Sequence, residues 1–126
     1  MLVLDSGAVT ALADNPPRAA RLIATLRRRG LWPPVVPSVV LAESLTGDDR
    51  RDALTNQLLQ ASAVDEVVSA ARARRAAALR SAAGRGSAVD ALVVATAEGS
   101  GVVLTWETSD LGALAAVARG VTVVGI

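Results

Sequence analysis

The chain has 126 residues, 52% of them apolar, and a formal net charge of +1. This length suits a single domain over residues 1–126 that can bury a real core, and the composition excludes intrinsic disorder. His, Cys, Lys, Tyr and Phe are absent, so imidazole and thiolate metal ligands, disulfides and Schiff bases are excluded, and any catalysis must come from carboxylates, hydroxyls, Arg, the backbone or a bound ion.

Short apolar runs alternate with segments of helical periodicity. In chain order, we predict a strand over residues 1–4, helices over 8–13 and 18–29, a strand over 31–36, helices over 38–45 and 48–60, a strand over 61–64, helices over 66–81 and 88–98, a strand over 102–105, a helix over 110–118 and a strand over 121–124. Gly30 is suited to end one helix, and Ser38 to cap the next. Together the elements indicate an α/β fold, with a mostly parallel central sheet of about five short strands flanked by helices on both faces.

The twelve acidic residues fall into two groups. Seven lie in polar or turn-like surroundings, which indicate helix caps or solvated faces: Asp14, Asp48, Asp49, Asp52, Asp65, Glu66 and Glu98. The other five follow strands or lie beside apolar helix positions, and they are the candidate catalytic residues: Asp5, Glu43, Asp90, Glu107 and Asp110.

Three of the five candidates follow predicted strands. Asp5 comes directly after residues 1–4, and Glu107 and Asp110 follow residues 102–105. Because open α/β sheets bind ligands at the carboxyl ends of their strands, these carboxylates are expected at one edge. The remaining two, Glu43 and Asp90, lie in predicted helices with apolar neighbours three and four positions away, so we expect both on buried faces.

Burying an ionised carboxylate costs several kcal/mol unless something compensates its charge. Residues 1–13, 35–47 and 88–117 contain no Arg, although an Arg from elsewhere in the chain can reach across in three dimensions. A divalent cation shared by several carboxylates is the more economical solution. Oxygen donors alone favour Mg²⁺ or Mn²⁺ over Zn²⁺. Such a site is typical of phosphoryl chemistry, because a metal-bound water is a better nucleophile and the ion stabilises charge on the attacked phosphate.

Four segments resemble, in order, the acidic motifs of the PIN domain family. They are LVLDS at residues 2–6, PSVVLAE at 37–43, AVDALVVATA at 88–97 and VLTWETSDL at 103–111. The third is the closest match, and the order and spacing agree over nearly the whole chain. The length and arrangement are similar to those of VapC toxins, which belong to bacterial type II toxin–antitoxin pairs.

The resemblance implies a parallel sheet sandwiched by helices and an Mg²⁺- or Mn²⁺-dependent endoribonuclease. Such an enzyme hydrolyses phosphodiesters of structured RNA, such as tRNA or rRNA, by metal-activated water. The resemblance also implies a homodimer that is silenced by a small VapB-like antitoxin. Asp5, Glu43 and Asp90 match the first three acidic positions. Asp5 and Asp90 are then the primary metal ligands, with Glu43, Glu107 and Asp110 completing the site or holding ligating waters.

The fourth acidic position departs from the family pattern. The family usually has Asp two residues after the Thr or Ser that ends the strand, whereas this chain has Glu107 after Thr105. Asp110 matches a second acidic position of many members, so either residue is a candidate for the fourth role. Thr105 can hold a carboxylate or a metal-bound water, or serve as an ordinary strand residue. Ser6 can do the same, or cap the following helix.

Several side chains are candidates for binding surfaces. RNA binding needs cations beside the acidic pocket, and two basic groups are available: Arg18, Arg21, Arg27, Arg28 and Arg29 in the first, and Arg72, Arg74, Arg75, Arg80 and Arg85 in the second. Both are equally consistent with solvated helix faces. Trp106 either stacks on a base or packs at the strand end. Leu22, Ile23, Leu26 and Leu45 are candidates for a dimer or antitoxin groove, or for the core.

Two functions therefore remain open. The first is the metal-dependent endoribonuclease toxin. The second is a non-catalytic PIN-like module that binds RNA or a partner through a relaxed acidic site, which the Glu107 departure motivates. Receiver domains and haloacid-dehalogenase-type phosphatases fit less well, because Lys is absent and Gly7 stands where the second Asp of the phosphatases is needed. We expect a cytoplasmic protein without a membrane partner, since no apolar run approaches the ~20 residues of a spanning helix.

Overall fold

The computed structural model describes residues 1–126. All five strands form one sheet in which every neighbouring pair is parallel, in the order β3-β2-β1-β4-β5. The strands are β1 (Leu2–Leu4), β2 (Val35–Pro37), β3 (Ala63–Asp65), β4 (Val102–Thr105) and β5 (Thr122–Gly125). The predicted α/β class and the five short parallel strands are thus confirmed.

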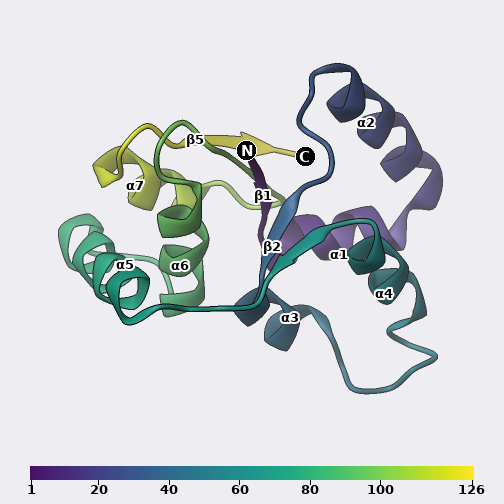
Figure 1. Cartoon of the computed structure of the whole chain (residues 1–126), viewed down its shortest axis with the longest axis horizontal. Coiled ribbons are helices and arrows are strands. Elements are labelled where there is room, and N and C mark those ends of the chain that lie inside the picture. The colour runs from purple at the N-terminus through teal and green to yellow at the C-terminus, as the bar shows by residue number, and fades with distance from the viewer.

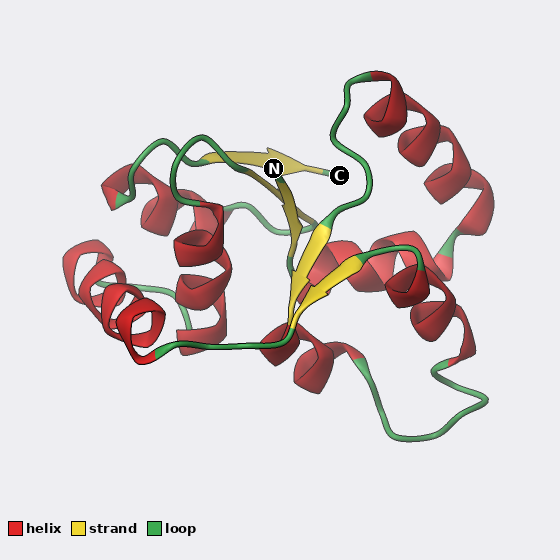
Figure 2. Cartoon of the chain, in the orientation of Figure 1, coloured by secondary structure: helices red, strands yellow, loops and turns green.

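Seven helices cover the sheet on both faces, as predicted. They are α1 (Ser6–Asp14), α2 (Pro16–Arg28), α3 (Ser38–Ser44), α4 (Ala53–Gln60), α5 (Ala70–Ala83), α6 (Ala88–Ala97) and α7 (Ser109–Val117). Helices α5, α6 and α7 pack together on one side, and α1 packs against α2, α3 and α4 on the other (Figure 1). The strands lie between these two groups (Figure 2). None of the seven helices combines the length and the apolar character that a membrane-spanning helix needs.

The core is centred on β1, the middle strand of the sheet. Leu2, Val3 and Leu4 are all buried, with Val3 paired to Val35 of β2 and Leu4 paired to Leu104 of β4. A strand covered by helices on both faces buries side chains of both orientations, which explains its purely apolar sequence. The apolar core thereby fixes the position of the residue that follows β1.

The strand order creates a topological switch point between β1 and β4. From β1 the chain moves outward through β2 and β3, and it then returns to form β4 and β5 on the other side of β1. In open α/β sheets, ligands bind at the carboxyl ends of the strands where the order reverses. Asp5 follows β1 and Trp106 follows β4, so both residues lie at this switch point.

Three elements begin four or five residues later than the sequence predicted, each for a local reason. Strand β2 begins at Val35 rather than at residue 31, because Pro33 and Pro34 have no N–H to donate to a neighbouring strand. Helix α4 begins at Ala53, since the Asp48 carboxylate accepts hydrogen bonds from the N–H groups of Arg50 and Arg51 and holds a turn there. Helix α5 begins at Ala70, where Ser69 caps it.

The predicted capping role of Ser38 is wrong. Pro37 is the N-cap of α3, and no side chain caps this helix. The Ser38 hydroxyl instead donates to the carbonyl of Glu66, at 3.4 Å, and so bridges the segment after β2 to the segment after β3.

Candidate active site

Asp5 is the most constrained acidic side chain at the switch point. It is the N-cap of α1, and its Oδ1 accepts a hydrogen bond from the N–H of Ala8 at 2.7 Å. Only 7% of the residue is exposed. A carboxylate capping a helix N-terminus interacts favourably with the helix dipole, which helps this charge tolerate burial. Asp5 therefore performs the capping role that the sequence had suggested for Ser6.

Thr105 connects β4 to Asp5. Its hydroxyl is fully buried and donates to Asp5 Oδ2 at 2.5 Å, while the N–H of Glu107 donates to the same hydroxyl at 3.1 Å. This bond joins residues that are 100 positions apart in the chain. Of the two roles considered for Thr105, holding a carboxylate is the one observed.

The surroundings of Asp5 make its ionised form less favourable than in water. Burial raises the pKa of Asp5 above its ordinary value of 3.8, the hydrogen bonds from Thr105 and Ala8 oppose this rise, and the negative charges of Asp90 and Glu43 add to it. These two acids are close enough to affect Asp5 electrostatically. Asp5, which follows β1, thus experiences repulsion from acids of α3 and α6, and a cation would relieve this repulsion.

Asp90 lies in the first turn of α6 and forms a reciprocal capping box with Ser87. The N–H of Asp90 donates to Ser87 Oγ, and Asp90 Oδ2 accepts from the N–H of Ser87, both at 3.0 Å. The residue is half-buried. Oδ1 makes no hydrogen bond within the chain, so one carboxylate oxygen is available to a ligand.

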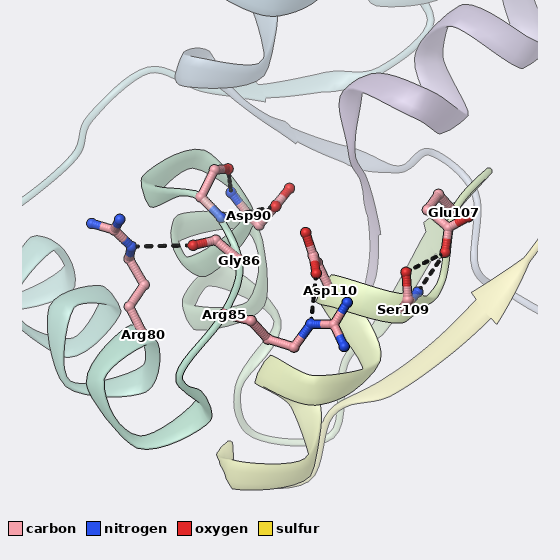
Figure 3. A network of polar contacts seen from close by, with 8 residues as sticks. Arg80, Arg85, Gly86, Asp90, Glu107, Ser109 and Asp110 are labelled. Atoms are coloured by element: carbon pink, nitrogen blue, oxygen red, sulfur yellow. Dashed lines mark hydrogen bonds and ion pairs between the residues drawn. The ribbon is translucent and has the colours of Figure 1, made fainter.

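Glu107 and Asp110 differ from each other in how their charge is compensated. Glu107 is exposed, and its Oε1 accepts from the N–H of Ser109 at 2.8 Å and from the Ser109 hydroxyl at 2.5 Å. These bonds, with a smaller contribution from the charge of Arg85, hold the pKa of Glu107 below its usual 4.5. Asp110 forms an ion pair with Arg85 at 2.8 Å (Figure 3). The Arg that can reach across in three dimensions therefore exists, and it neutralises Asp110.

A pocket of about 520 Å³ lies beside Asp5, at the carboxyl edge of the sheet. Its lining comes from the start of α1, the α1–α2 junction, α3 and the residue after β4: Ser6, Gly7, Thr10, Ala11, Asp14, Asn15, Arg18, Glu43 and Trp106. Glu43 faces this pocket and is exposed, so its predicted place on a buried apolar face is wrong. Asp14, for which the sequence had suggested a solvated or capping role, also lines the pocket.

The donor set fits Mg²⁺ or Mn²⁺ in kind, since it consists of carboxylate and hydroxyl oxygens only. No three acidic side chains are grouped closely enough to hold one ion together. Mg²⁺ commonly uses one or two carboxylates and completes its shell with water and substrate phosphate. One or two carboxylates of this site, completed by water and substrate phosphate, are therefore enough in number for such an ion.

The two basic groups of the sequence differ in how far their charge is already paired. In the second group, Arg72 pairs with Asp65, Arg75 with Glu98 at 2.7 Å, and Arg85 with Asp110. The five arginines of the first group lie along α2 and just after it, and none is in an ion pair. Arg74 and Arg80 of the second group are unpaired as well, but the only cation that lines the pocket beside Asp5 is Arg18 of α2.

Two features of the site region were not found from the sequence. The Arg85–Asp110 pair joins residues 25 positions apart, and nothing in the local pattern signals it. Asp52 is buried rather than solvated, because its carboxylate accepts bonds from the N–H groups of Thr46 and Gly47 and from the Thr46 hydroxyl. The Thr46-Gly47 turn preceding an acidic residue was the available signal.

The apolar candidates for a groove divide between core and surface. Leu26 belongs to the buried core, whereas Leu22, Ile23 and Leu45 are partly buried against it. Ile23 lines a pocket of about 250 Å³ that is formed by α1, α2 and α4 and is mostly apolar.

The sequence model of the PIN domain family matches residues 2–118. No curated protein matches the chain. PIN domains are generally metal-dependent nucleases that use Mg²⁺ or Mn²⁺, and the parallel five-stranded sheet described above is consistent with a single domain of this kind. With the match covering nearly the whole chain, the protein belongs to the PIN domain family.

Proposed function

We propose that this PIN domain is an Mg²⁺- or Mn²⁺-dependent endoribonuclease, and that it serves as the toxin of a VapBC-type toxin–antitoxin pair. The substrate class is structured RNA, such as tRNA or rRNA. Asp5 and Asp90 are the metal-binding carboxylates, and Glu43, Glu107 and Asp110 are the candidates for completing the site.

One observation carries the proposal. Asp5 is a buried carboxylate at the switch point of the sheet, and it lies in the negative field of Asp90 and Glu43 without an Arg partner. Elsewhere the chain does provide such partners, since Asp65, Glu98 and Asp110 are each paired to Arg. Uncompensated acids at a ligand-binding edge are what a divalent-cation site requires.

Each residue then has a separate task. Asp5 is oriented by the Ala8 N–H and the Thr105 hydroxyl, and it offers its remaining lone pairs to the ion. Asp90 contributes its free Oδ1, while the capping box fixes its position. When bound, the ion supplies an activated water and stabilises charge on the attacked phosphate. Arg18 is the one cation among the pocket-lining residues, and it is available to the phosphates that flank the cleaved bond.

The proposed partners are a VapB-like antitoxin and a second copy of the chain. Unpaired arginines on α2 and the apolar pocket bordered by Ile23 and Leu58 are the surfaces that support a protein partner. Co-expression with any small reading frame that lies next to the gene tests the antitoxin partnership, and size-exclusion chromatography with light scattering of the protein alone tests the homodimer.

RNA cleavage by the purified protein tests the catalytic proposal. Total RNA is incubated with Mg²⁺, Mn²⁺ or EDTA, and new 5′ ends are mapped. We expect metal-dependent cleavage that Asp5→Asn and Asp90→Asn each abolish, while both variants keep their circular dichroism spectrum. Asp49→Asn is the matched control, because Asp49 is exposed in the α3–α4 loop and makes no hydrogen bond or ion pair. Retained cleavage in either site variant would contradict the assignment.

The alternative function is a non-catalytic module with a relaxed acidic site. Two observations favour it: no three acids form a metal-binding group, and Asp110 is already neutralised by Arg85. In that case the natural protein cuts no RNA with either ion, and Glu107→Asp raises cleavage from a negligible level. Cleavage by the natural protein with Mn²⁺ would exclude this alternative.

A further inference from the structure

Trp106 is the only exposed aromatic residue in a chain that contains two. Sixty per cent of Trp106 is exposed, whereas Trp32 packs against the core. The chain has no Tyr or Phe. Trp106 is therefore the aromatic side chain that is most open to a ligand.

The backbone of Trp106 is held against the catalytic edge while its ring stays open to solvent. Trp106 follows Thr105, the residue whose hydroxyl holds Asp5. On its other side, a Cβ added to Gly7 would lie 3.2 Å from the Cβ of Trp106, so the first turn of α1 approaches too closely for a larger residue to fit freely. The indole is thus fixed at its base, one residue from the Asp5–Thr105 contact.

Arg18 lies close to the Trp106 ring and lines two neighbouring pockets. Its guanidinium carbon lies 5.9 Å from the centroid of the Trp106 ring, and it forms no ion pair. Arg18 lines the pocket beside Asp5 and also a second pocket of about 490 Å³, between α2 and the end of β5, where Arg21 lies as well. Figure 1 shows the carboxyl end of β5 directed toward α2.

The charges in the first pocket define the side from which an anionic ligand approaches. Asp14 and Glu43 are acidic, and Arg18 is the only cation in the lining. A phosphate is repelled from the acidic side and attracted toward Arg18, whose guanidinium lies over the Trp106 ring. An exposed aromatic face beside unpaired arginines is the combination that binds unpaired nucleotides, because every base has a π-face and every nucleotide has a phosphate.

We propose that Trp106 and Arg18 form a subsite for one unpaired nucleotide of the RNA, with the base on the indole and its phosphates along Arg18 and Arg21. The proposal rests on the proposed endoribonuclease function and narrows its substrate. The RNA must present an unstacked base beside the cleaved bond, in a loop, a bulge or a flipped position, because bases stacked in a duplex offer no free face.

Fluorescence of Trp106 tests stacking without any cleavage. In the Trp32→Phe variant, Trp106 is the only tryptophan. The probe is a short single-stranded oligoadenylate with 2′-O-methyl sugars, compared with a strand of the same length and charge that lacks all bases, in EDTA. We expect both strands to bind but only the base-bearing strand to quench Trp106. Equal quenching by both strands would overturn the proposal, as it would show that the ligand contacts Trp106 through its backbone alone.

Affinity provides a second measurement that does not depend on the Trp32→Phe variant folding. Base–aromatic stacking of the usual strength predicts that Trp106→Ala weakens oligoadenylate binding by about 5- to 140-fold, and that Trp106→Phe restores most of it. Arg18→Gln should lower the salt dependence of binding, by about 0.7 in the log–log slope for each phosphate that Arg18 neutralises. Unchanged affinity in Trp106→Ala would overturn the proposal and favour a protein ligand at this face.

Cleavage assays separate this proposal from the proposed function. If the protein cuts RNA but Trp106→Ala changes neither oligoadenylate affinity nor the position of the cut, the subsite is wrong and the nuclease stands. If the base-dependent quenching is observed but no RNA is cut with either ion, the subsite stands and the nuclease is wrong.

Discussion

Replacing Asp5 with Asn tests whether the acidic site is maintained at the expense of fold stability. The Asn side chain has the same shape and can still accept the Ala8 N–H. Its amide can donate to the Thr105 hydroxyl, which in turn can donate to the carbonyl of Glu107, 3.0 Å away. The substitution therefore removes the charge and preserves the hydrogen-bond network.

The magnitude follows from two opposing contributions. Burying the Asp5 carboxylate destabilises the fold by several kcal/mol. The two hydrogen bonds that Asp5 accepts, at 2.7 and 2.5 Å, each stabilise the fold by about 1.5–3 kcal/mol, because the acceptor is charged. Because the pKa of Asp5 is raised overall, with burial as the largest cause, the penalty outweighs the bonds. We expect Asp5→Asn to stabilise the fold by about 1 kcal/mol near neutral pH, a rise in Tm of about 3 °C.

Thermal unfolding in EDTA across a pH series is the assay. The pKa of Asp5 in the folded protein lies above 3.8, so the gain in stability of the Asn variant over the wild type is absent below pH 3.8. This gain grows as pH rises from 3.8 through the folded pKa and is complete above it. Adding Mg²⁺ should raise the Tm of the wild type and leave the variant unchanged, since only the charged site binds the ion. A lower Tm for the variant at neutral pH, or an advantage that grows toward acid, would refute the reasoning.

Three further predictions concern other parts of the fold and site. Gly86→Ala should lower the free energy of unfolding by about 2–4 kcal/mol, because Gly86 has a φ of +94° and a Cβ added there would lie 2.6 Å from the Leu114 side chain. Gly112→Ala is the control, since a Cβ at Gly112 meets nothing within 4 Å. Denaturant melts of both variants measure the difference. Asp52→Asn should lower the Tm at neutral pH, because loop N–H groups hold the pKa of Asp52 in the folded protein below 3.8. The difference in Tm between wild type and variant should fade as pH falls from 3.8 through that folded pKa. A difference in Tm that persists below the folded pKa would contradict this. Glu107→Asp should change the Mn²⁺ concentration that gives half-maximal cleavage if this position faces the ion, and an unchanged value would leave Asp110 as the fourth acid.

The sequence predicted the sheet well because the signal for each strand is local. The apolar run at residues 2–4 ends at Asp5, and the run that begins after Gly101 ends at Thr105, so the ends of both strands could be identified, and with them the acids that follow. The strand order was not predicted. It depends on how seven helices distribute over two faces, and no single segment contains that information.

The partners of charged side chains were the least predictable feature. Arg-free windows around Asp5, Asp90 and Asp110 suggested that all three lacked a counter-charge, yet Arg85 reaches Asp110 from the loop before α6. Helical spacing placed Glu43 on an apolar face, although α3 has only seven residues and ends before that face is covered. Contacts between distant segments decide both outcomes, and periodicity does not encode them.

The ion pairs that do form strengthen the case for a cation at the switch point. Arg72, Arg75 and Arg85 each pair with an acid other than Asp5, whereas Arg18 of α2 lines the pocket beside Asp5 and forms no ion pair. An Arg paired with Asp5 would offset the cost of burying its charge, but it would also occupy the position that an ion and a phosphate must share. Arginines kept nearby but not bonded to the central carboxylate leave both ligands room, and that arrangement suits a phosphodiester-cleaving site better than a structural ion pair.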